Sequence, residues 1–422
     1  MAELGHDVVG VDVDAHKVEL LSNGQAPFFE PELEDLLARN VDAGRLTFTQ
    51  DFSAIEGAQI HFIGVGTPQS ESGAADMTYV DAAFSYMLPH LGHCTSGPEV
   101  VAGKSTVPVG TASRLAQAIE PTGALLVWNP EFLREGFAVQ DTLRPDRMVY
   151  GLPADPGAAT KAQEAMDTVY EQILISGTPR LLMDYATAEL VKISANAFLA
   201  TKISFINAMS QVCDAAGANV TALAEAIGMD DRIGRRFLRA GIGFGGGCLP
   251  KDIRAFQARA DELGVGDALT FLAEVDKVND TMRAGVIRTV RGLLGDRLAG
   301  ATVTVLGAAF KPDSDDMRNS PALDLAVELA HLAKRVVVHD PAAGPILAER
   351  SNRPYEVALS AHSALEGTDL VLIGTEWREY RDLDPAQAAD LVRTRYVIDG
   401  RNCLDAQAWK AAGWSYRGIG RR

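Results

Sequence analysis

The chain has 422 residues, 47% of them hydrophobic and 7% aromatic, which is enough apolar material for more than one core. This composition is typical of packed α/β enzymes and excludes a disordered or fibrous protein. The formal net charge of −17 argues against a nucleic-acid partner, so an anionic ligand would need a local cluster of Arg and Lys. No apolar run has the length of a membrane span, and the N-terminus does not resemble a signal peptide.

The four cysteines, Cys94, Cys213, Cys248 and Cys403, form no CxxC motif. We therefore expect neither a disulfide framework nor a metal site, and we expect the protein in the reducing cytoplasm.

In the first half of the chain, apolar strands are followed by polar loops. Residues 6–14 (HDVVGVDVD), 56–68 (EGAQIHFIGVGTP) and 99–111 (EVVAGKSTVPVGT) show this pattern. Residues 129–136 (NPEFLREG) follow the apolar run ALLVW and offer Glu131 and Glu135 at the carboxyl end of a strand. Ligands of α/β sheets bind at such ends. For each carboxylate taken alone, a solvated loop residue is the simpler interpretation.

The middle of the chain is predicted to be helical. Residues 187–217 carry apolar residues at helical spacing without an internal Gly or Pro. Lys192 and Asn196 lie four residues apart and share a face of this helix. Because the rest of that face is apolar, Lys192 either extends outward to water or points into a site.

A basic run, residues 230–241 (DDRIGRRFLRAG), follows. Arg232, Arg235 and Arg239 fall at i, i+3 and i+7. Such a run forms either an exposed charged face or a diphosphate-binding site.

Residues 243–252 (GFGGGCLPKD) place Cys248 between a glycine run and a predicted helix that starts near Pro250. The glycines would let backbone approach a ligand closely. A helix N-terminus and the nearby Lys251 both favour the reactive thiolate form of Cys248, whereas a small buried hydrophobe is the simpler reading of this cysteine.

The second half repeats the first. Residues 302–311, 335–341, 366–377 and 395–402 again read as buried strands, which predicts two doubly wound parallel-sheet domains joined by a helical region. In the second half, Gly307 ends the first strand and Asp340 ends the next, 33 residues later (340 − 307). The same spacing before Asp12 falls ahead of residue 1. We therefore expect the N-terminal domain to lack its first strand and its GxGxxG loop in this sequence.

Several segments together resemble the UDP-glucose/GDP-mannose 6-dehydrogenase family. They are GVDVD, GTP, STVPVGT, NPEFLREG, KISANAFLATKISFIN, GFGGGCLPKD, FKPDSDDMR and VIDGR, in the family's order and across nearly the whole chain. STVPVGT and GFGGGCLPKD look more like the UDP-glucose branch than the GDP-mannose or UDP-N-acetylmannosamine branches. The resemblance implies an NAD-binding domain over residues 1–178, a helical dimerisation domain over 179–295 and a UDP-sugar-binding domain over 296–422.

The resemblance also implies the reaction, which is two successive NAD-dependent oxidations of a sugar C6 hydroxyl to a carboxylate. An aldehyde cannot release a second hydride until a nucleophile adds to it, and a cysteine thiolate can add and form a thiohemiacetal and then a thioester. The implied catalytic residues are Cys248, Lys192, Asn196, Asp252, Glu131 and Thr106.

The family's binding roles map onto matching positions. The residues implied to bind NAD are Asp12, Lys17, Thr67, Thr106, Glu135, Lys251 and Arg318. Those implied to bind the UDP-sugar, besides Glu131, Lys192 and Asn196, are Phe132, Leu133, Arg232, Phe237, Arg239, Phe244, Gly245, Lys311 and Arg401. Arg232 would reach the neighbouring subunit's site in a homodimer.

The glycine loop is missing either because the start of the sequence is placed too late, which we favour, or because the chain has lost the loop. We therefore expect weak NAD binding by this 422-residue form and activity in a form extended at its N-terminus. Other readings stay open: a GDP-mannose or UDP-N-acetylmannosamine dehydrogenase, or a single-step dehydrogenase of the 6-phosphogluconate or 3-hydroxyisobutyrate type, which needs no cysteine. A truncated paralogue that only binds nucleotide-sugars is a non-enzymatic alternative.

Overall fold

The computed structural model describes residues 1–421. The chain divides into two compact units, Met1–Ala195 with Ala255–Gly266, and Asn196–Arg254 with Asp267–Arg422. Helices α8 (Tyr185–Ala216) and α10 (Leu249–Glu262) each begin in one unit and end in the other, and the units are described separately. The expected domain boundaries at residues 178 and 295 stay a prediction.

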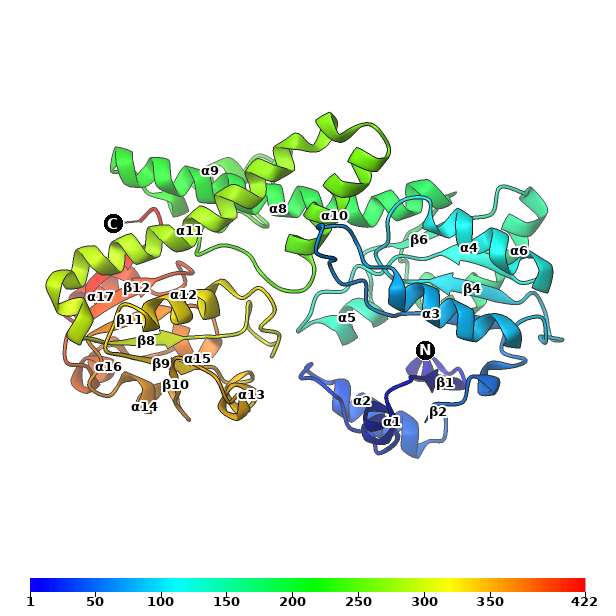
Figure 1. Cartoon of the computed structure of the whole chain (residues 1–422), viewed down its shortest axis with the longest axis horizontal. Helices are drawn as coiled ribbons and strands as arrows, with labels where there is room; N and C mark the ends of the chain where they lie inside the picture. Colours follow the sequence, from blue (N-terminus) through cyan, green and yellow to red (C-terminus); the bar gives the residue numbers. More distant parts are fainter. Residues whose placement is uncertain (422) are drawn as a thin grey trace. The chain divides into compact units, whose positions relative to one another are not determined.

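The second unit contains a six-stranded, fully parallel sheet with the strand order β10-β9-β8-β11-β12-β13 (Figure 1). In chain order this is 3-2-1-4-5-6, the order of dinucleotide-binding folds. Its central strands are buried on both faces because helices cover them, and this explains the continuous apolar run LVLI of residues 370–373. The strands are β8 (Thr302–Leu306), β9 (Arg335–His339), β10 (Glu356–Val357), β11 (Leu370–Ile373), β12 (Tyr396–Asp399) and β13 (Ser415–Gly418).

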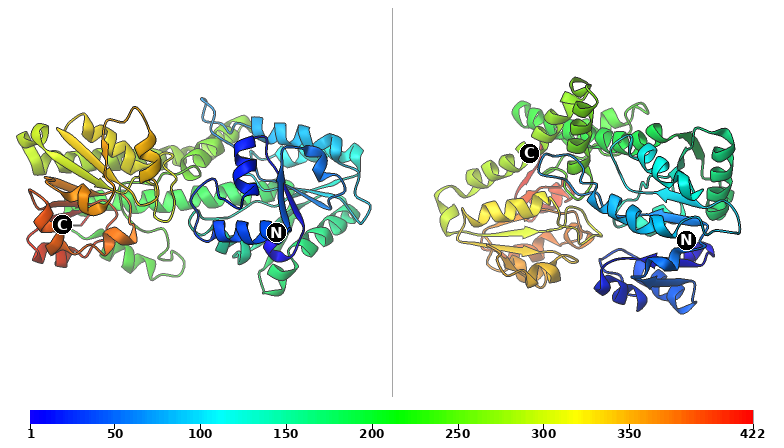
Figure 2. Two further views of the ribbon diagram at one scale, coloured as in Figure 1. Left: turned by 90° about the horizontal axis from the view of Figure 1, so that it is seen from below. Right: turned by 45° about the vertical axis from the view of Figure 1, so that its right-hand side comes forward.

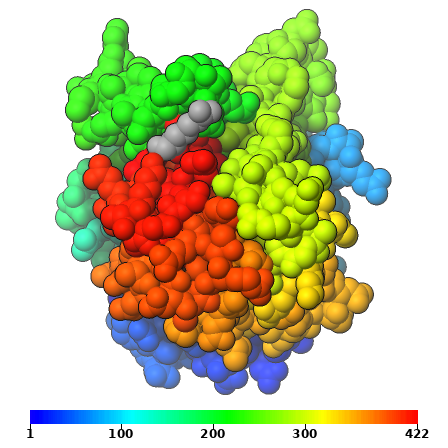
Figure 3. Space-filling model, turned by 90° about the vertical axis from the view of Figure 1, so that its left-hand side faces the viewer, coloured from blue at the N-terminus to red at the C-terminus, as the bar shows by residue number. Residues whose placement is uncertain are grey.

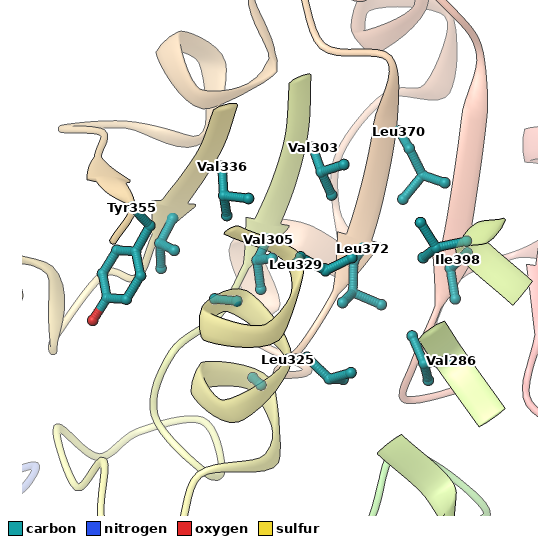
Figure 4. Close-up of a cluster of buried hydrophobic side chains, with 14 of the residues drawn as sticks. Val286, Val303, Val305, Leu325, Leu329, Val336, Tyr355, Leu370, Leu372 and Ile398 are labelled. Atoms are coloured by element: carbon teal, nitrogen blue, oxygen red, sulfur yellow. The ribbon is translucent and has the colours of Figure 1, made fainter. Parts of the chain in front are cut away.

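Helices α11 (Thr270–Leu294) and α12 (Pro321–Ala330) cover one face of this sheet. Figure 4 shows Leu325 and Leu329 of α12 and Val286 of α11 directed at the side chains of the strands. Leu325 and Leu329 are fully buried, so replacing either by Ala would cost about 2–5 kcal/mol of stability.

The C-terminal residues attach this sheet to the helices of the same unit. The Val220 N–H, at the start of α9 (Val220–Gly228), donates to the Gly420 carbonyl oxygen at 2.9 Å. A Cβ atom on Gly420 would lie 2.7 Å from the Ser210 Cα, so only glycine allows this approach. Figure 3 shows the C-terminal residues, in red, against the green helical segment.

The first unit contains a five-stranded sheet with the order β3-β4-β5-β6-β7, in which only β5 and β6 pair in antiparallel fashion. The sequence analysis predicted strands alternating with helices in this half, and this pattern is confirmed. The strands are β3 (Ile60–Ile63), β4 (Val100–Gly103), β5 (Leu125–Trp128), β6 (Met148–Leu152) and β7 (Arg180–Asp184). The main helices around them are α3 (Thr78–Met87), α4 (Thr111–Ile119), α6 (Pro156–Val169) and the start of α8.

Strands β1 (Val8–Val11) and β2 (Leu46–Thr49) form a separate parallel pair with α1 (Ala15–Ser22) and α2 (Leu33–Asp42). Figures 1 and 2 show this pair, in dark blue, apart from the five-stranded sheet. In the second unit the matching strands, β9 and β11, both pair with β8. Within residues 1–421, no strand pairs with both β1 and β3. The expectation that a first strand and a glycine loop are missing stays a prediction.

The long helix predicted over residues 187–217 is confirmed as α8, which spans 32 residues. Three of its apolar side chains face solvent although they are large. Phe198, Phe205 and Val212 follow one another at intervals of seven residues and are 66%, 49% and 56% exposed. Residues seven apart lie on the same face of a helix, so α8 carries an exposed apolar stripe.

Candidate active site

The loops that follow β3 and β4 are joined to one another. The Thr67 hydroxyl donates to the Thr106 carbonyl oxygen at 2.8 Å, and the Ser105 hydroxyl donates to the Val65 carbonyl oxygen at 2.6 Å. Because β3, β4 and β5 run in parallel, their carboxyl ends lie at one edge of the sheet. The structure thus brings together Thr67 and Thr106, which the family resemblance assigns to the cofactor site.

Lys192 points inward and pairs with Glu131 of the loop after β5. The Lys192 Nζ lies 3.3 Å from the Glu131 Oε1, and the lysine residue is only 6% exposed. Glu131 also accepts a hydrogen bond from the Leu133 N–H at 2.6 Å, and the Lys192 ammonium lies 5.5 Å from the centre of the Phe132 ring. The interpretation in which Lys192 extends outward to water is therefore wrong.

A second lysine, Lys104, lies in the same region, and the sequence analysis did not identify it. Lys104 follows β4 directly and donates from Nζ to the Asn129 Oδ1 at 3.0 Å. Burial lowers the pKa of Lys104 to about 8; the nearby Glu131 carboxylate opposes this shift and the Lys192 ammonium adds to it. The available signal was its position, directly before STVPVGT at the end of a strand.

Glu189, one helical turn before Lys192 on α8, fixes the loop that contains Thr106. Its carboxylate accepts hydrogen bonds from the N–H groups of Gly110 and Ala112 at 2.7 and 2.6 Å, at the start of α4. An anion at this position offsets the partial positive charge of a helix N-terminus. The Arg259 guanidinium donates to the Val109 carbonyl oxygen in the same loop, so the loop is held from both sides.

The expected adenosine contacts lie at the end of β1. The Asp12 carboxylate is 38% exposed, and the Lys17 Nζ lies 3.7 Å from its Oδ2. Farther along the chain, Gly64 and Gly66 follow β3, and a Cβ atom on either would meet nothing within 4 Å. Open backbone at a strand end and an exposed carboxylate after β1 fit a dinucleotide.

Glu135, also expected near the cofactor, sits in a loop that Glu30 orders. The Glu30 carboxylate accepts from the N–H groups of Gly136 and Ala138 at 2.7 and 2.8 Å. Glu30 is itself buried, so segments far apart in sequence set the path of NPEFLREG.

In the second unit, Cys248 stands immediately before α10, as predicted, and is exposed. Its carbonyl oxygen accepts from the Asp252 N–H at 2.9 Å, which closes the first helical turn. Backbone N–H groups at a helix start stabilise a thiolate, so the position suits a nucleophile.

Asp252 joins two of the predicted residues in one cluster. Its Oδ2 accepts from the Asn196 Nδ2 at 2.6 Å, and its Oδ1 accepts from the Lys251 Nζ at 2.7 Å. Asp252 is 2% exposed and Asn196 7%. Burial strengthens both contacts and fixes the side chains in one arrangement.

The glycine run next to Cys248 packs against the chain itself. Cβ atoms added to Gly245, Gly246 and Gly247 would lie 2.1, 2.8 and 2.4 Å from atoms of Asn319, Phe310 and Arg318. These contacts give a reason for the glycines other than the close approach to a ligand that the sequence suggested. The Arg318 guanidinium also pairs with Asp316 at 2.8 Å.

Arg401 clamps three loops. Its guanidinium donates to the carbonyl oxygens of Gly374, Gly243 and Phe310 at 2.8, 2.8 and 3.3 Å. Lys311 follows Phe310, and its Nζ lies 5.1 Å from the centre of that ring. The structure thus groups Arg401 and Lys311 beside the glycine run.

Phe244 is buried, and its backbone is held on both sides by Asn279. The Phe244 N–H donates to the Asn279 Oδ1 at 2.7 Å, and the Asn279 Nδ2 donates to the Phe244 carbonyl oxygen at 3.0 Å. The residue is 7% exposed, which leaves little of it for a ligand.

The basic run over residues 230–241 is irregular rather than helical. Arg232 pairs with Asp230 at 2.6 Å and its side chain is 89% exposed. Phe237, with a φ of 65°, and Arg239 are exposed as well. The Arg residues therefore do not share a helical face, and the sequence spacing of i, i+3 and i+7 was misleading.

Two groups of predicted residues thus exist, one in each unit: Thr67, Thr106, Glu131 and Lys192 in the first, and Asn196, Cys248, Lys251 and Asp252 in the second. Cys248 and Lys192 belong to different units, so the expectation that they lie close together stays a prediction. Within residues 1–421, no group of His, Cys, Asp and Glu could hold a metal ion, and no helix is long and apolar enough to cross a membrane.

Mainly parallel α/β sheets with polar loops at their carboxyl ends, in both halves of one chain, are typical of nucleotide-binding proteins. Three models of the UDP-glucose/GDP-mannose dehydrogenase family match in order: the NAD binding domain at residues 1–174, the central domain at 186–281 and the UDP binding domain at 304–406. The chain belongs to this family, and its cofactor is NAD.

Individual relatives agree with the family models. UDP-glucose 6-dehydrogenase TuaD of Bacillus subtilis is 40% identical over 427 residues, covering all of this chain and 89% of its own. A UDP-glucose 6-dehydrogenase of Rhizobium meliloti is also 40% identical, with 95% of its length covered. The structure of a UDP-glucose dehydrogenase from Pyrobaculum islandicum matches with a TM-score of 0.88 and 36% identity, over all of this chain and 94% of that one.

Proposed function

We propose that the protein oxidises UDP-glucose to UDP-glucuronate in two successive NAD-dependent steps, with Cys248 as the covalent carrier. The observation that carries this proposal is the exposed Cys248 at the start of α10, joined by its backbone to the buried Asp252–Asn196 cluster. Relatives that cover the whole chain at 40% identity bear the name UDP-glucose 6-dehydrogenase, which supports UDP-glucose over the other nucleotide-sugars.

In the first oxidation, the C6 hydroxyl of the sugar loses a proton and a hydride and becomes an aldehyde. Lys192 stabilises the negative charge that develops on the oxygen, and Asn196, one turn along α8, donates a hydrogen bond to it. Bound NAD supplies the hydride acceptor for this oxidation and, after exchange, for the second.

In the second oxidation, the Cys248 thiolate adds to the aldehyde carbon, which forms a C–S bond and a thiohemiacetal. Loss of a hydride and a proton from this adduct gives a thioester. Asp252 and Thr106 orient a water molecule and Glu131 accepts its proton. Attack of the water breaks the C–S bond, releases the carboxylate and returns the thiolate.

The cofactor and substrate roles follow the family's positions. Asp12 and Lys17 would hold the adenosine ribose, and Thr67, Thr106, Glu135, Lys251 and Arg318 would line the rest of the NAD site. The nucleotide-sugar would meet Phe132, Leu133, Phe237, Arg239, Phe244, Gly245, Lys311 and Arg401. The family's UDP binding domain, at residues 304–406, includes Lys311 and Arg401, which supports their assignment.

We also propose that two copies of the chain form a homodimer. The exposed stripe of Phe198, Phe205 and Val212 on α8 supports a homodimer through the central helices, because such apolar stripes are normally covered. The exposed Arg232 would then reach the partner's site.

A Cys248→Ser variant tests the mechanism. We expect it to stop at a covalent or aldehyde-level intermediate and to form no UDP-glucuronate, as measured by mass spectrometry of the products. The matched control is Cys94→Ser, in a loop of the first unit, which should keep wild-type turnover. Unimpaired product formation by Cys248→Ser would remove the cysteine from the mechanism. GDP-mannose and UDP-N-acetylmannosamine, assayed in parallel with the wild type, test the choice of sugar.

A further inference from the structure

Lys104 holds the loop from which Glu131 extends. Besides donating to the Asn129 Oδ1 at 3.0 Å, it accepts a hydrogen bond from the Glu131 N–H at its own carbonyl oxygen, at 3.3 Å. Lys104 thus contacts the NPEFLREG loop through both its side chain and its backbone.

Both polar atoms of the Asn129 side chain have hydrogen-bond partners. Its Oδ1 also accepts from the Tyr170 hydroxyl at 2.8 Å, and its Nδ2 donates to the Val149 carbonyl oxygen at 2.9 Å. Asn129 is 1% exposed, so removing any of these partners leaves a buried polar group unsatisfied. The Asn129 Oδ1, which accepts the hydrogen bond from Lys104, is therefore held in a fixed position.

The charged surroundings of Lys104 come from two other elements. Glu131, from the loop after β5, and Lys192, from α8, both act on it electrostatically, and they form an ion pair with each other. The titratable Tyr170, at the end of α6, places its ring 5.9 Å from the Lys104 Nζ, and burial raises the pKa of this phenol. Glu131 thus lies in the field of two lysines.

We propose that Lys104 is a positioning residue for the Glu131–Lys192 pair, because it anchors the Glu131 loop through Asn129 and adds a second positive charge next to the pair. This inference rests on the proposed function. A further positive charge stabilises the anion that develops where Lys192 acts, so the charged form of Lys104 supports faster turnover.

The charge of Lys104 changes within the range in which the protein can be assayed. Since its pKa is lowered to about 8, wild-type Lys104 is a cation at pH 7 and mostly neutral at pH 9. Arg stays charged at both values and Gln stays neutral at both. The wild type should therefore behave like Lys104→Arg at low pH and like Lys104→Gln at high pH.

The test is the pH profile of kcat, expressed as the ratio of each variant to the wild type. Lys104→Gln should reduce kcat about tenfold at pH 7, equivalent to about 1.4 kcal/mol, and the ratio should approach one above pH 9. Lys104→Arg should match the wild type at pH 7 and exceed it at pH 9. The control, Lys161→Gln, changes an exposed lysine of α6 and should follow the wild type throughout. Ratios that are low and independent of pH in both variants would overturn the proposal.

A second readout does not require turnover. The unfolded chain holds the Lys104 proton up to about pH 10.4 and the folded chain releases it near pH 8, so stability rises with pH between these values. The urea midpoint of the wild type should therefore rise relative to Lys104→Gln from pH 8 to pH 10. A constant difference would overturn the proposal, whether or not the wild type oxidises UDP-glucose. Failure of the proposed function alone would leave this titration in place.

Discussion

The side-chain amide of Asn196 donates a hydrogen bond to the carboxylate of Asp252, with 2.6 Å between Nδ2 and Oδ2, and both side chains are buried. The other oxygen of Asp252 accepts from Lys251. Each oxygen of the carboxylate thus has a donor, and the first turn of α10 is fixed relative to the Asn196 side chain. Cys248, whose carbonyl oxygen closes that turn, takes its position from the same cluster.

Asp252→Asn is expected to disrupt this cluster without changing its shape. An amide has one acceptor and one donor group, so in either orientation an N–H would face Asn196 or Lys251. We expect kcat to fall about 100-fold, in the range that general acid–base groups contribute, with wild-type secondary structure by circular dichroism. The control is Asp261→Asn, at an exposed position of the same helix. Activity within threefold of wild type for Asp252→Asn would exclude Asp252 from the mechanism.

The buried His61 predicts how stability depends on pH. Burial lowers the pKa of His61, while the hydrogen bond from its Nε2 to the Glu99 Oε1, at 2.8 Å, raises it by less. The folded chain therefore binds this proton less readily than the unfolded chain, and stability falls as the pH decreases through about 6.5.

Urea unfolding of the wild type and His61→Gln at pH 7.5 and pH 5.5 measures this effect. The loss of stability on acidification should be smaller in the variant, whatever its stability at pH 7.5. Equal losses in both proteins would show that another group dominates the acid response.

The apolar stripe on α8 predicts the effect of charge on assembly. Phe198→Glu combined with Phe205→Glu should convert the proposed dimer to a monomer, because two buried carboxylates at an interface lack partners. Light scattering coupled to size exclusion measures the mass directly. Ile175→Glu, at a 78% exposed position of the first unit, should leave the mass unchanged. A dimeric double variant would place the interface elsewhere.

The regular elements were predictable because their signals are local. The strand from Leu370 to Ile373 is a continuous apolar run, and α8 has no Gly or Pro from Tyr185 to Ala216. The repeated strand order also predicted two parallel-sheet domains. The position of Cys248 at a helix start followed from Pro250 and from the amphipathic stretch after it.

The rest depends on contacts between distant segments. The fit of Gly247 against Arg318 and the burial of Lys104 beside Lys192 arise only once the chain is folded. Spacing also misled at Arg232, Arg235 and Arg239, because helical periodicity assigns a shared face only where a helix forms. These features depend on burial and long-range packing, and no local sequence pattern indicates either.

The central claim is that one carbon is oxidised twice because Cys248 carries it between the two steps. The most direct measurement is the amount of NADH formed for each UDP-glucose consumed, by absorbance and by chromatography of the nucleotide-sugars in the same reaction. We predict two NADH and one UDP-glucuronate for each UDP-glucose consumed. One NADH for each sugar, with an alcohol oxidised only to the carbonyl level, would contradict it.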